Sequence, residues 1–143
     1  MKTKILQPKD TSRSWRLVDA EGVTLGRLAS KVASILMGKD KTSFSPHQDW
    51  GDYVIVVNAK KVRVTGRKAE VKTYFSHSGY VGNAKLVPYE TMMIKKPTEI
   101  IRHAVHGMIQ CKGPLGRAIN KKLFIYADAE HPHVAQKPEA FKV

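Results

Sequence analysis

The segment Lys112–Arg117, which reads KGPLGR, carries the most distinctive local chemistry of the chain. Its proline and two glycines restrict the backbone path, and a helix beginning near Gly116 would direct free backbone amides toward an anion. Lys112 and Arg117 would flank that anion with positive charge. The pattern predicts a phosphate-binding segment without a catalytic group, and two further lysines follow it, Lys121 and Lys122.

A second basic stretch directly follows the apolar run Tyr53–Val57 and is opposed only by Glu70. Within it, Val62 and Val64 alternate with charged or polar residues, which predicts a short strand with one apolar and one cationic face. A rigid core would therefore present positive charge to a polyanion. The cations of this stretch are Lys60, Lys61, Arg63, Arg67, Lys68 and Lys72.

Aromatic and histidine side chains alternate with glycines from Tyr74 to Asn83. Such a stretch suits stacking on exposed nucleic-acid bases, and the alternative is a loop that folds its rings back onto the core. We expect Phe75 to pack on the core and His77 to contact a ligand. Tyr80 is a second candidate for base contact.

Two weaker patterns would suggest enzymatic chemistry. Asp49 and Asp52 could pair for acid–base catalysis, but turn and strand-entry roles explain these carboxylates more simply. Gly22–Gly26 lies between a predicted strand and a predicted helix, yet it matches neither the dinucleotide fingerprint nor the Walker pattern. We expect no catalytic residue.

The histidines raise the question of a metal site. His103 and His106 lie about one helical turn apart, and His131 and His133 follow far along the chain. Cysteine and carboxylate partners at supporting spacings are missing, so surface or phosphate-facing histidines are the simpler interpretation. We expect no metal and no cofactor.

Hydrophobic periodicity indicates the elements that position these residues. Tyr53–Val57 is short and rich in β-branched residues, as is typical of a strand buried on both faces of a parallel sheet. Strands are also predicted at Trp15–Val18 and Phe124–Tyr126, and a short helix at Tyr89–Lys95. A further helix opens at Pro97, and its apolar face is formed by Ile100, Ile101, Ala104, Val105 and Met108.

The helix after the first strand has the clearest pattern. Thr24 is a plausible N-cap, apolar residues recur at helical spacing from Leu25 to Leu36, and Gly38 supplies a stop. Arg27 lies on the polar face, and the link that follows carries Lys39 and Lys41. Strand and helix signals alternate, so the predicted class is α/β with helices on a small, mainly parallel sheet.

Composition limits the partners. The 143 residues include 25 Lys and Arg against 12 Asp and Glu, a formal charge of +13, which favours nucleic acid or an anionic membrane surface. No run approaches the roughly 20 apolar residues of a membrane span, and Met1–Ser14 has no signal-peptide core. We expect a cytoplasmic protein with an N-terminal arm, residues 1–14, and one domain, residues 15–143, that ends in an extended tail.

Many short motifs, dispersed in one order, resemble a known family. The chain is similar to the thirteenth large-subunit ribosomal protein family in its bacterial form over essentially its whole length. The residues that carry the resemblance are Val18–Ala20, Thr24–Ala29, Pro46–His47, Gly51–Tyr53, Val64–Gly66, His77–Gly79, Gly107–Met108, Lys112–Arg117, Tyr126–Ala127 and Glu130–His133.

The resemblance implies a three-layer α/β/α sandwich around a four-stranded parallel sheet. It also implies a structural, non-enzymatic role in the cytoplasmic ribosome, with early entry into the large subunit and no bound cofactor. The partners would be large-subunit ribosomal RNA and neighbouring ribosomal proteins rather than a membrane or a second copy of the chain.

These expectations define a set of candidate RNA contacts. Most would bind phosphate or sugar and position the protein, whereas His77 and Tyr80 would contact bases. The rival classes are an enzyme acting on a phosphorylated substrate, which lacks convergent acid–base residues, and a membrane-surface protein, for which the helix after Thr24 has too few cations. The candidates are Arg27, Lys39, Lys41, Lys60, Lys61, Arg63, Arg67, Lys68, Lys72, His77, Tyr80, Lys112, Arg117, Lys121 and Lys122.

Overall fold

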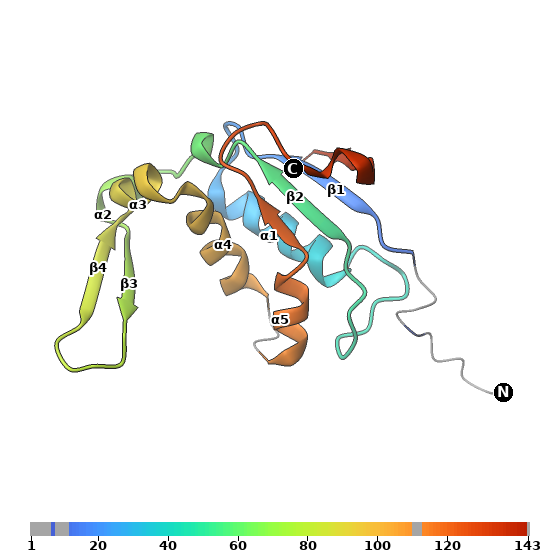
Figure 1. The fold of residues 1–143 in the computed structure, drawn as a ribbon, viewed down its shortest axis with the longest axis horizontal. Coiled ribbons are helices and arrows are strands. Elements are labelled where there is room, and N and C mark those ends of the chain that lie inside the picture. The colour runs from blue at the N-terminus through green and yellow to red at the C-terminus, as the bar shows by residue number, and fades with distance from the viewer. Residues whose placement is uncertain (1–6, 8–11, 110–112, 143) are drawn as a thin grey trace.

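The structure is a computed structural model in which residues 7, 12–109 and 113–142 are described. A four-stranded parallel sheet has the order β5-β2-β1-β6 (Figure 1). This sheet and its helices confirm the predicted α/β class. The strands are β1 (Trp15–Asp19), β2 (Tyr53–Val57), β5 (Leu123–Ile125) and β6 (Glu139–Phe141).

One face of the sheet forms the main core together with two helices, α1 (Leu25–Met37) and α4 (Pro97–Met108). Val54 and Val56 of the central strand are fully buried there. Gly38 ends α1 in the left-handed conformation, with φ of 76°, as its predicted stop position requires. The apolar face predicted for α4 packs on the core through Ile100, Ile101 and Val105, and Met108 at its C-terminal end is 39% exposed.

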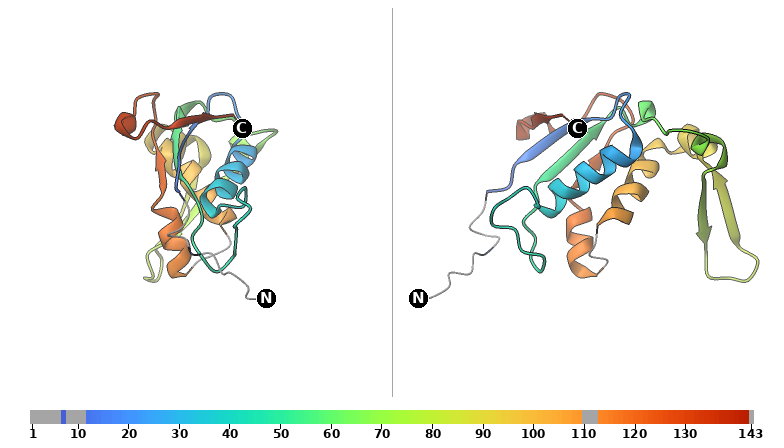
Figure 2. Two further views of the ribbon diagram at one scale, coloured as in Figure 1. Left: turned by 90° about the vertical axis from the view of Figure 1, so that its right-hand side faces the viewer. Right: turned by 180° about the vertical axis from the view of Figure 1, so that it is seen from behind.

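The opposite face of the sheet is covered by a thin layer from the C-terminal segment. Trp15 and Tyr53 stack with ring centroids 4.5 Å apart, and the Phe124 ring lies 5.5 Å from Trp15. His133, at the start of the 3-10 helix η3 (His133–Gln136), packs 4.6 Å from Phe124. Figure 2 shows η3 and α1 on opposite sides of the sheet, which gives the domain three layers.

The strand expected at Val62–Val64 is not part of the sheet. The chain leaves β2 through the 3-10 helix η2 (Ala59–Lys61), and Arg63 then forms only an isolated bridge with Thr24. Val62 is buried against the core, so its apolar pattern reflects packing at the sheet end rather than a ladder. The fourth strand is β6, where no regular structure was predicted, and it pairs with β1.

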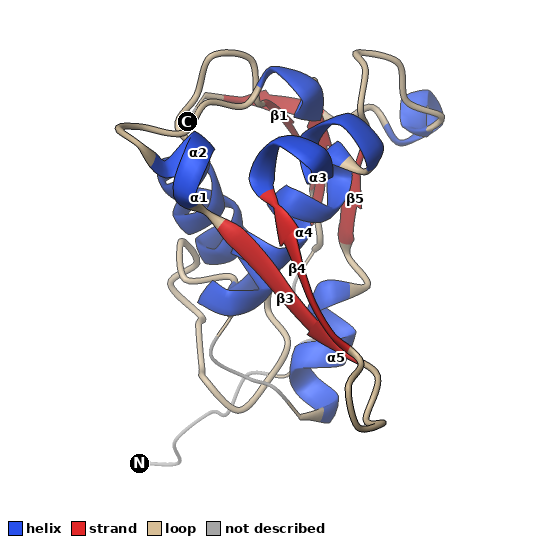
Figure 3. Ribbon diagram, turned by 90° about the vertical axis from the view of Figure 1, so that its left-hand side faces the viewer, coloured by secondary structure: helices blue, strands red, loops and turns tan. Residues whose placement is uncertain are grey.

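A second unit projects from the body at the left of Figure 1, and Figure 3 looks onto its hairpin. It consists of α2 (Lys68–Val71), the antiparallel strands β3 (Thr73–His77) and β4 (Ala84–Pro88), and α3 (Tyr89–Lys95). The hairpin replaces the predicted loop. Phe75 is 67% exposed and faces Leu86 across the strands, so the expected packing of Phe75 on the core is wrong.

The helix of the Lys112–Arg117 segment also differs from its prediction. Helix α5 (Pro114–Asn120) begins at Pro114, not near Gly116, because proline is favoured in the first turn. Gly113 has φ of −77°, so it takes no left-handed conformation. Within the described residues, no helix is long and apolar enough to cross a membrane.

Candidate nucleic-acid interface

Lys122 is an interior residue and not a surface contact. Its side chain is 4% exposed, and its Nζ donates hydrogen bonds to the Gly51 carbonyl oxygen at 2.9 Å and to the Asp49 carboxylate. Burial lowers the pKa of Lys122, and the Asp49 carboxylate opposes that shift. The prediction that Lys122 contacts RNA is therefore wrong, because its charge is used inside the fold.

Asp49 and Asp52, the possible acid–base pair of the sequence, belong to the same internal network as Lys122. Asp52 is buried and accepts hydrogen bonds from Lys41 Nζ at 2.6 Å and from the Ser14 backbone N–H at 3.0 Å. Asp49 pairs with Lys122 and also with Arg13, at 3.4 Å. These contacts fix the strand entry, as the simpler interpretation of the sequence expected.

Two exposed lysines at the end of β2 also have carboxylate partners. Lys60 Nζ lies 2.8 Å from an Asp128 carboxylate oxygen, and Lys61 Nζ lies 2.8 Å from a Glu21 oxygen. The hydrogen bond to Glu21 raises the pKa of Lys61. Because exposed ion pairs are weak, these carboxylates only partly offset the charge of the two lysines.

A first group of free cations surrounds α2. Within the described residues, none of these side chains has a carboxylate at salt-bridge distance, and all are exposed. Three of them line a hollow of about 250 Å³ between α2 and α4, together with Thr65 and Met108. We call this group the α2 patch; it consists of Arg63, Arg67, Lys68 and Lys72.

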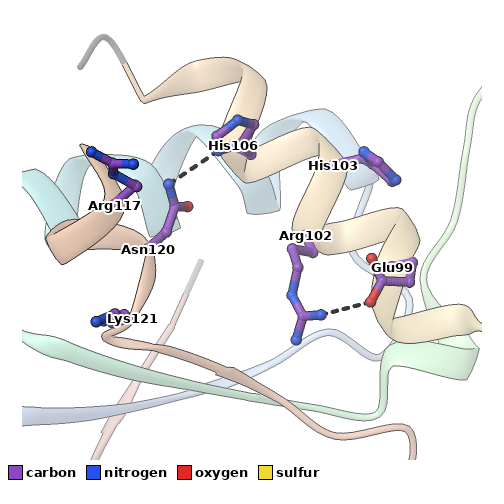
Figure 4. A pocket seen from close by; sticks show the side chains of 7 residues that line it. All are labelled: Glu99, Arg102, His103, His106, Arg117, Asn120 and Lys121. Atoms are coloured by element: carbon purple, nitrogen blue, oxygen red, sulfur yellow. Dashed lines mark hydrogen bonds and ion pairs between the residues drawn. The ribbon is translucent and has the colours of Figure 1, made fainter. Parts of the chain in front are cut away.

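A second group lies between α4 and α5 and lines a cavity of about 450 Å³ (Figure 4). Helix α5 contributes the predicted residue Arg117, and Lys121 follows it directly. Neither has a carboxylate partner in the described part of the chain. We call this cavity the α4–α5 pocket; its lining residues are Glu99, Arg102, His103, His106, Arg117, Asn120 and Lys121.

Hydrogen bonds order two sides of the α4–α5 pocket. Arg102 Nη1 lies 2.6 Å from a Glu99 carboxylate oxygen on the same helix. Asn120 Nδ2 donates to the Gly116 carbonyl oxygen at 2.8 Å and lies 3.0 Å from His106 Nδ1. Sequence reasoning missed Arg102 and Asn120. Arg102 precedes His106 by four residues on α4, and Asn120 follows Gly116 by four residues on α5. Both spacings place the two residues on one face of their helix.

The remaining candidates lie apart from these two groups. Arg27 and Lys39 are exposed, at the first turn of α1 and just after its end. His77 is exposed at the end of β3, where its Nδ1 accepts a hydrogen bond from the Gly79 N–H at 2.9 Å, and Tyr80 is 75% exposed in the hairpin turn. Lys112 lies outside the described residues.

The described side chains include no group of three histidine, cysteine or carboxylate residues that could hold a metal ion. His133 instead forms a hydrogen bond of 2.8 Å with the Tyr126 hydroxyl. His103 and His106 line the α4–α5 pocket, where the carboxylate of Glu99 is paired with Arg102 and the other charged lining residues are cations. The arrangement suits an anionic or planar ligand.

Comparison with known proteins adds independent information. The family model for ribosomal protein L13 matches residues 13–132, which include the α2 patch and the α4–α5 pocket. The large ribosomal subunit protein uL13 of Gemmatimonas aurantiaca is 55% identical over 141 residues, covering 98% of this chain and 94% of that protein. The uL13 proteins of Agathobacter rectalis and Tolumonas auensis are 54% identical over 142 residues and 50% identical over 143 residues, covering 99% and 100% of both chains.

Proposed function

The chain belongs to the ribosomal protein L13 family, and on this premise we propose that it is a structural constituent of the large ribosomal subunit. It binds large-subunit ribosomal RNA in the cytoplasm, enters the particle early in assembly and lies beside other ribosomal proteins. It acts as one copy and catalyses no reaction. The observation that carries this proposal is the gathering of unpaired cations into the α2 patch and the α4–α5 pocket.

The mechanism is electrostatic docking of a folded body. In the described part of the chain, no carboxylate pairs with a cation of the α2 patch, and Lys72 Nζ lies 5.4 Å from the centre of the Tyr74 ring. Each of these cations can therefore neutralise an RNA phosphate and release a condensed counterion. Lys41, Lys60 and Lys61 contribute less, because a carboxylate already neutralises each of them. Arg27, Lys39, His77 and Tyr80 are further proposed contacts at the edges of this interface.

Salt dependence of binding tests the proposal. If the protein contacts about 6 to 10 phosphates, its affinity for large-subunit ribosomal RNA falls about 10³- to 10⁵-fold between 50 and 200 mM salt. We expect Arg67→Ala with Lys68→Ala to lower the slope of log affinity against log salt by about 2, since each phosphate contributes about 0.9.

The control for this experiment is the double variant Lys60→Ala with Lys61→Ala. It removes the same number of cations, but both have carboxylate partners, so its slope should change by less than about 1. Equal losses for the two double variants would show that internal pairing does not select the docking cations. A wild-type protein that ignores salt would contradict electrostatic docking altogether.

A further inference from the structure

The α4–α5 pocket is larger than a phosphate contact requires. Its volume of about 450 Å³ lies within the range of about 300 to 1,000 Å³ that is typical of cavities for organic ligands. A duplex backbone is convex and would contact the rim of such a cavity without filling it. The pocket is open to solvent, so a group of this size can enter it from the surface.

The two walls of the pocket differ in chemistry. Helix α4 contributes planar side chains, His103 and His106, beside the guanidinium of Arg102. Arg102 is already neutralised by Glu99 at 2.6 Å, which leaves its planar face rather than its charge for a ligand. The opposite wall, at α5, contributes the unpaired cations Arg117 and Lys121.

The hydrogen bonds of Asn120 define which nitrogen of His106 is free. If the Asn120 amide were flipped, its oxygen would face the Gly116 carbonyl oxygen, so the amide nitrogen must be the atom near both acceptors. His106 Nδ1 therefore accepts a hydrogen bond, and the ring proton lies on Nε2. His106 thus retains one N–H donor for a ligand.

We propose that the α4–α5 pocket holds one unstacked nucleotide of the ribosomal RNA. The base lies against the rings of His103 and His106, and its phosphate lies beside Arg117 and Lys121. Proteins recognise single-stranded RNA in this way, by stacking splayed bases on aromatic or guanidinium planes while cations bind the backbone. This assignment rests on the proposed function for the identity of the RNA.

Nuclear magnetic resonance of the full chain with small probes tests the pocket. Adenosine 5′-monophosphate should shift the imidazole signals of His103 and His106 at about tenfold lower concentration than adenosine or inorganic phosphate, because base and phosphate act together. His47, His131 and His133 are internal references, because His77 is itself a proposed RNA contact. Equal shifts with inorganic phosphate, or no shift at millimolar nucleotide, would overturn the proposal.

Matched variants separate the pocket from the α2 patch. Lys121→Ala should weaken the nucleotide-dependent shifts, whereas Lys68→Ala should leave them unchanged. Arg117→Ala would remove the other cation of this wall, but Arg117 lies within α5 and its replacement could disturb the helix. Lys121 is exposed and lies just after α5, so Lys121→Ala preserves the fold. A Lys121→Ala response identical to that of the wild type would contradict the assigned phosphate position.

A final comparison separates a bound RNA nucleotide from a free one. A single-stranded oligoadenylate should shift the same histidine signals at lower concentration than the mononucleotide, because flanking phosphates reach nearby cations. Tighter binding of the mononucleotide would overturn the RNA assignment. If the wild-type protein showed the oligoadenylate shifts but no salt-dependent binding to ribosomal RNA, the proposed function would be contradicted. The pocket would then remain a nucleotide site.

Discussion

The interior site around Lys122 and the α2 patch use the same kind of side chain for opposite purposes. Lys122 is surrounded by the Asp49 carboxylate and two backbone carbonyl oxygens, from Leu36 and Gly51, so its charge holds the sheet end together. The cations of the α2 patch are exposed without such partners. A basic residue that is both buried and paired with a carboxylate, as Lys122 is, serves the fold, whereas an exposed cation is available to a ligand.

The largest effect on stability is expected from a substitution at Gly51, whose carbonyl oxygen accepts a hydrogen bond from Lys122. A Cβ on Gly51 would overlap the Leu36 carbonyl group and lie 2.8 Å from Lys122 Nζ. We expect Gly51→Ala to lower the free energy of unfolding by more than about 4 kcal/mol, measured by urea denaturation.

The control for Gly51→Ala is Gly26→Ala, in the first turn of α1. A Cβ there meets no atom within 4 Å, and alanine favours the helix, so stability should rise by about 0.5 to 1 kcal/mol. If Gly51→Ala lowered the free energy of unfolding by less than about 1 kcal/mol, the backbone before β2 would have to move easily to accommodate the new Cβ. The interior site would then be less rigid than its contacts imply.

Lys121 and Lys122 are adjacent in the chain, but the first is exposed and the second is buried. Lys122→Met leaves Asp49 without its main partner, so the free energy of unfolding should fall by about 3 kcal/mol. Lys121→Met should change it by less than about 0.5 kcal/mol, because that side chain is exposed, yet it should weaken RNA binding. Calorimetric unfolding and RNA titration of both variants check the two effects, and a reversed order would refute the division of roles.

A smaller, pH-dependent effect reports how the projecting unit joins the body. The Tyr74 hydroxyl is buried without a hydrogen-bond partner among the described atoms, and its burial raises the pKa of Tyr74 to about 12. The folded state therefore holds this proton more tightly than the unfolded state. That stabilising contribution is complete below pH 10 and is lost as the pH rises through about 12.

Tyr74→Phe tests this contribution. Between about pH 8 and pH 11 the wild type should lose more stability than the variant, measured by urea unfolding at each pH. Tyr80→Phe is the control, since Tyr80 is exposed in the hairpin turn and its replacement should leave the wild-type pH dependence in place. Parallel curves for wild type and Tyr74→Phe would show that the hydroxyl is solvated in solution.

Local patterns predicted much of the fold. The run Tyr53–Val57 and the helical spacing after Thr24 indicate β2 and α1 because burial and periodicity act within a few residues. Strand β6 has no such signal, since Glu139–Phe141 is stabilised by pairing with the distant β1. The hairpin was missed because its strands expose both apolar and polar side chains, so their alternation does not mark a buried face.

The candidate site was predictable in composition but not in arrangement. The basic runs identified Arg67 and Lys68 of the α2 patch, and the KGPLGR segment identified Arg117. Nothing near Lys122 in the sequence indicates burial, because its partner Asp49 lies 73 residues away along the chain. The α4–α5 pocket likewise depends on two helices coming together, which no local pattern encodes.

The pairing of β6 with β1 has a consequence for biosynthesis. Arg16 and Glu139 form an ion pair across 123 residues of chain, so the outermost strand joins the sheet only after residue 141 has emerged during translation. Contacts of such long sequence separation form late. Until then that edge of β1 is unpaired, and an unpaired strand edge can pair with another chain.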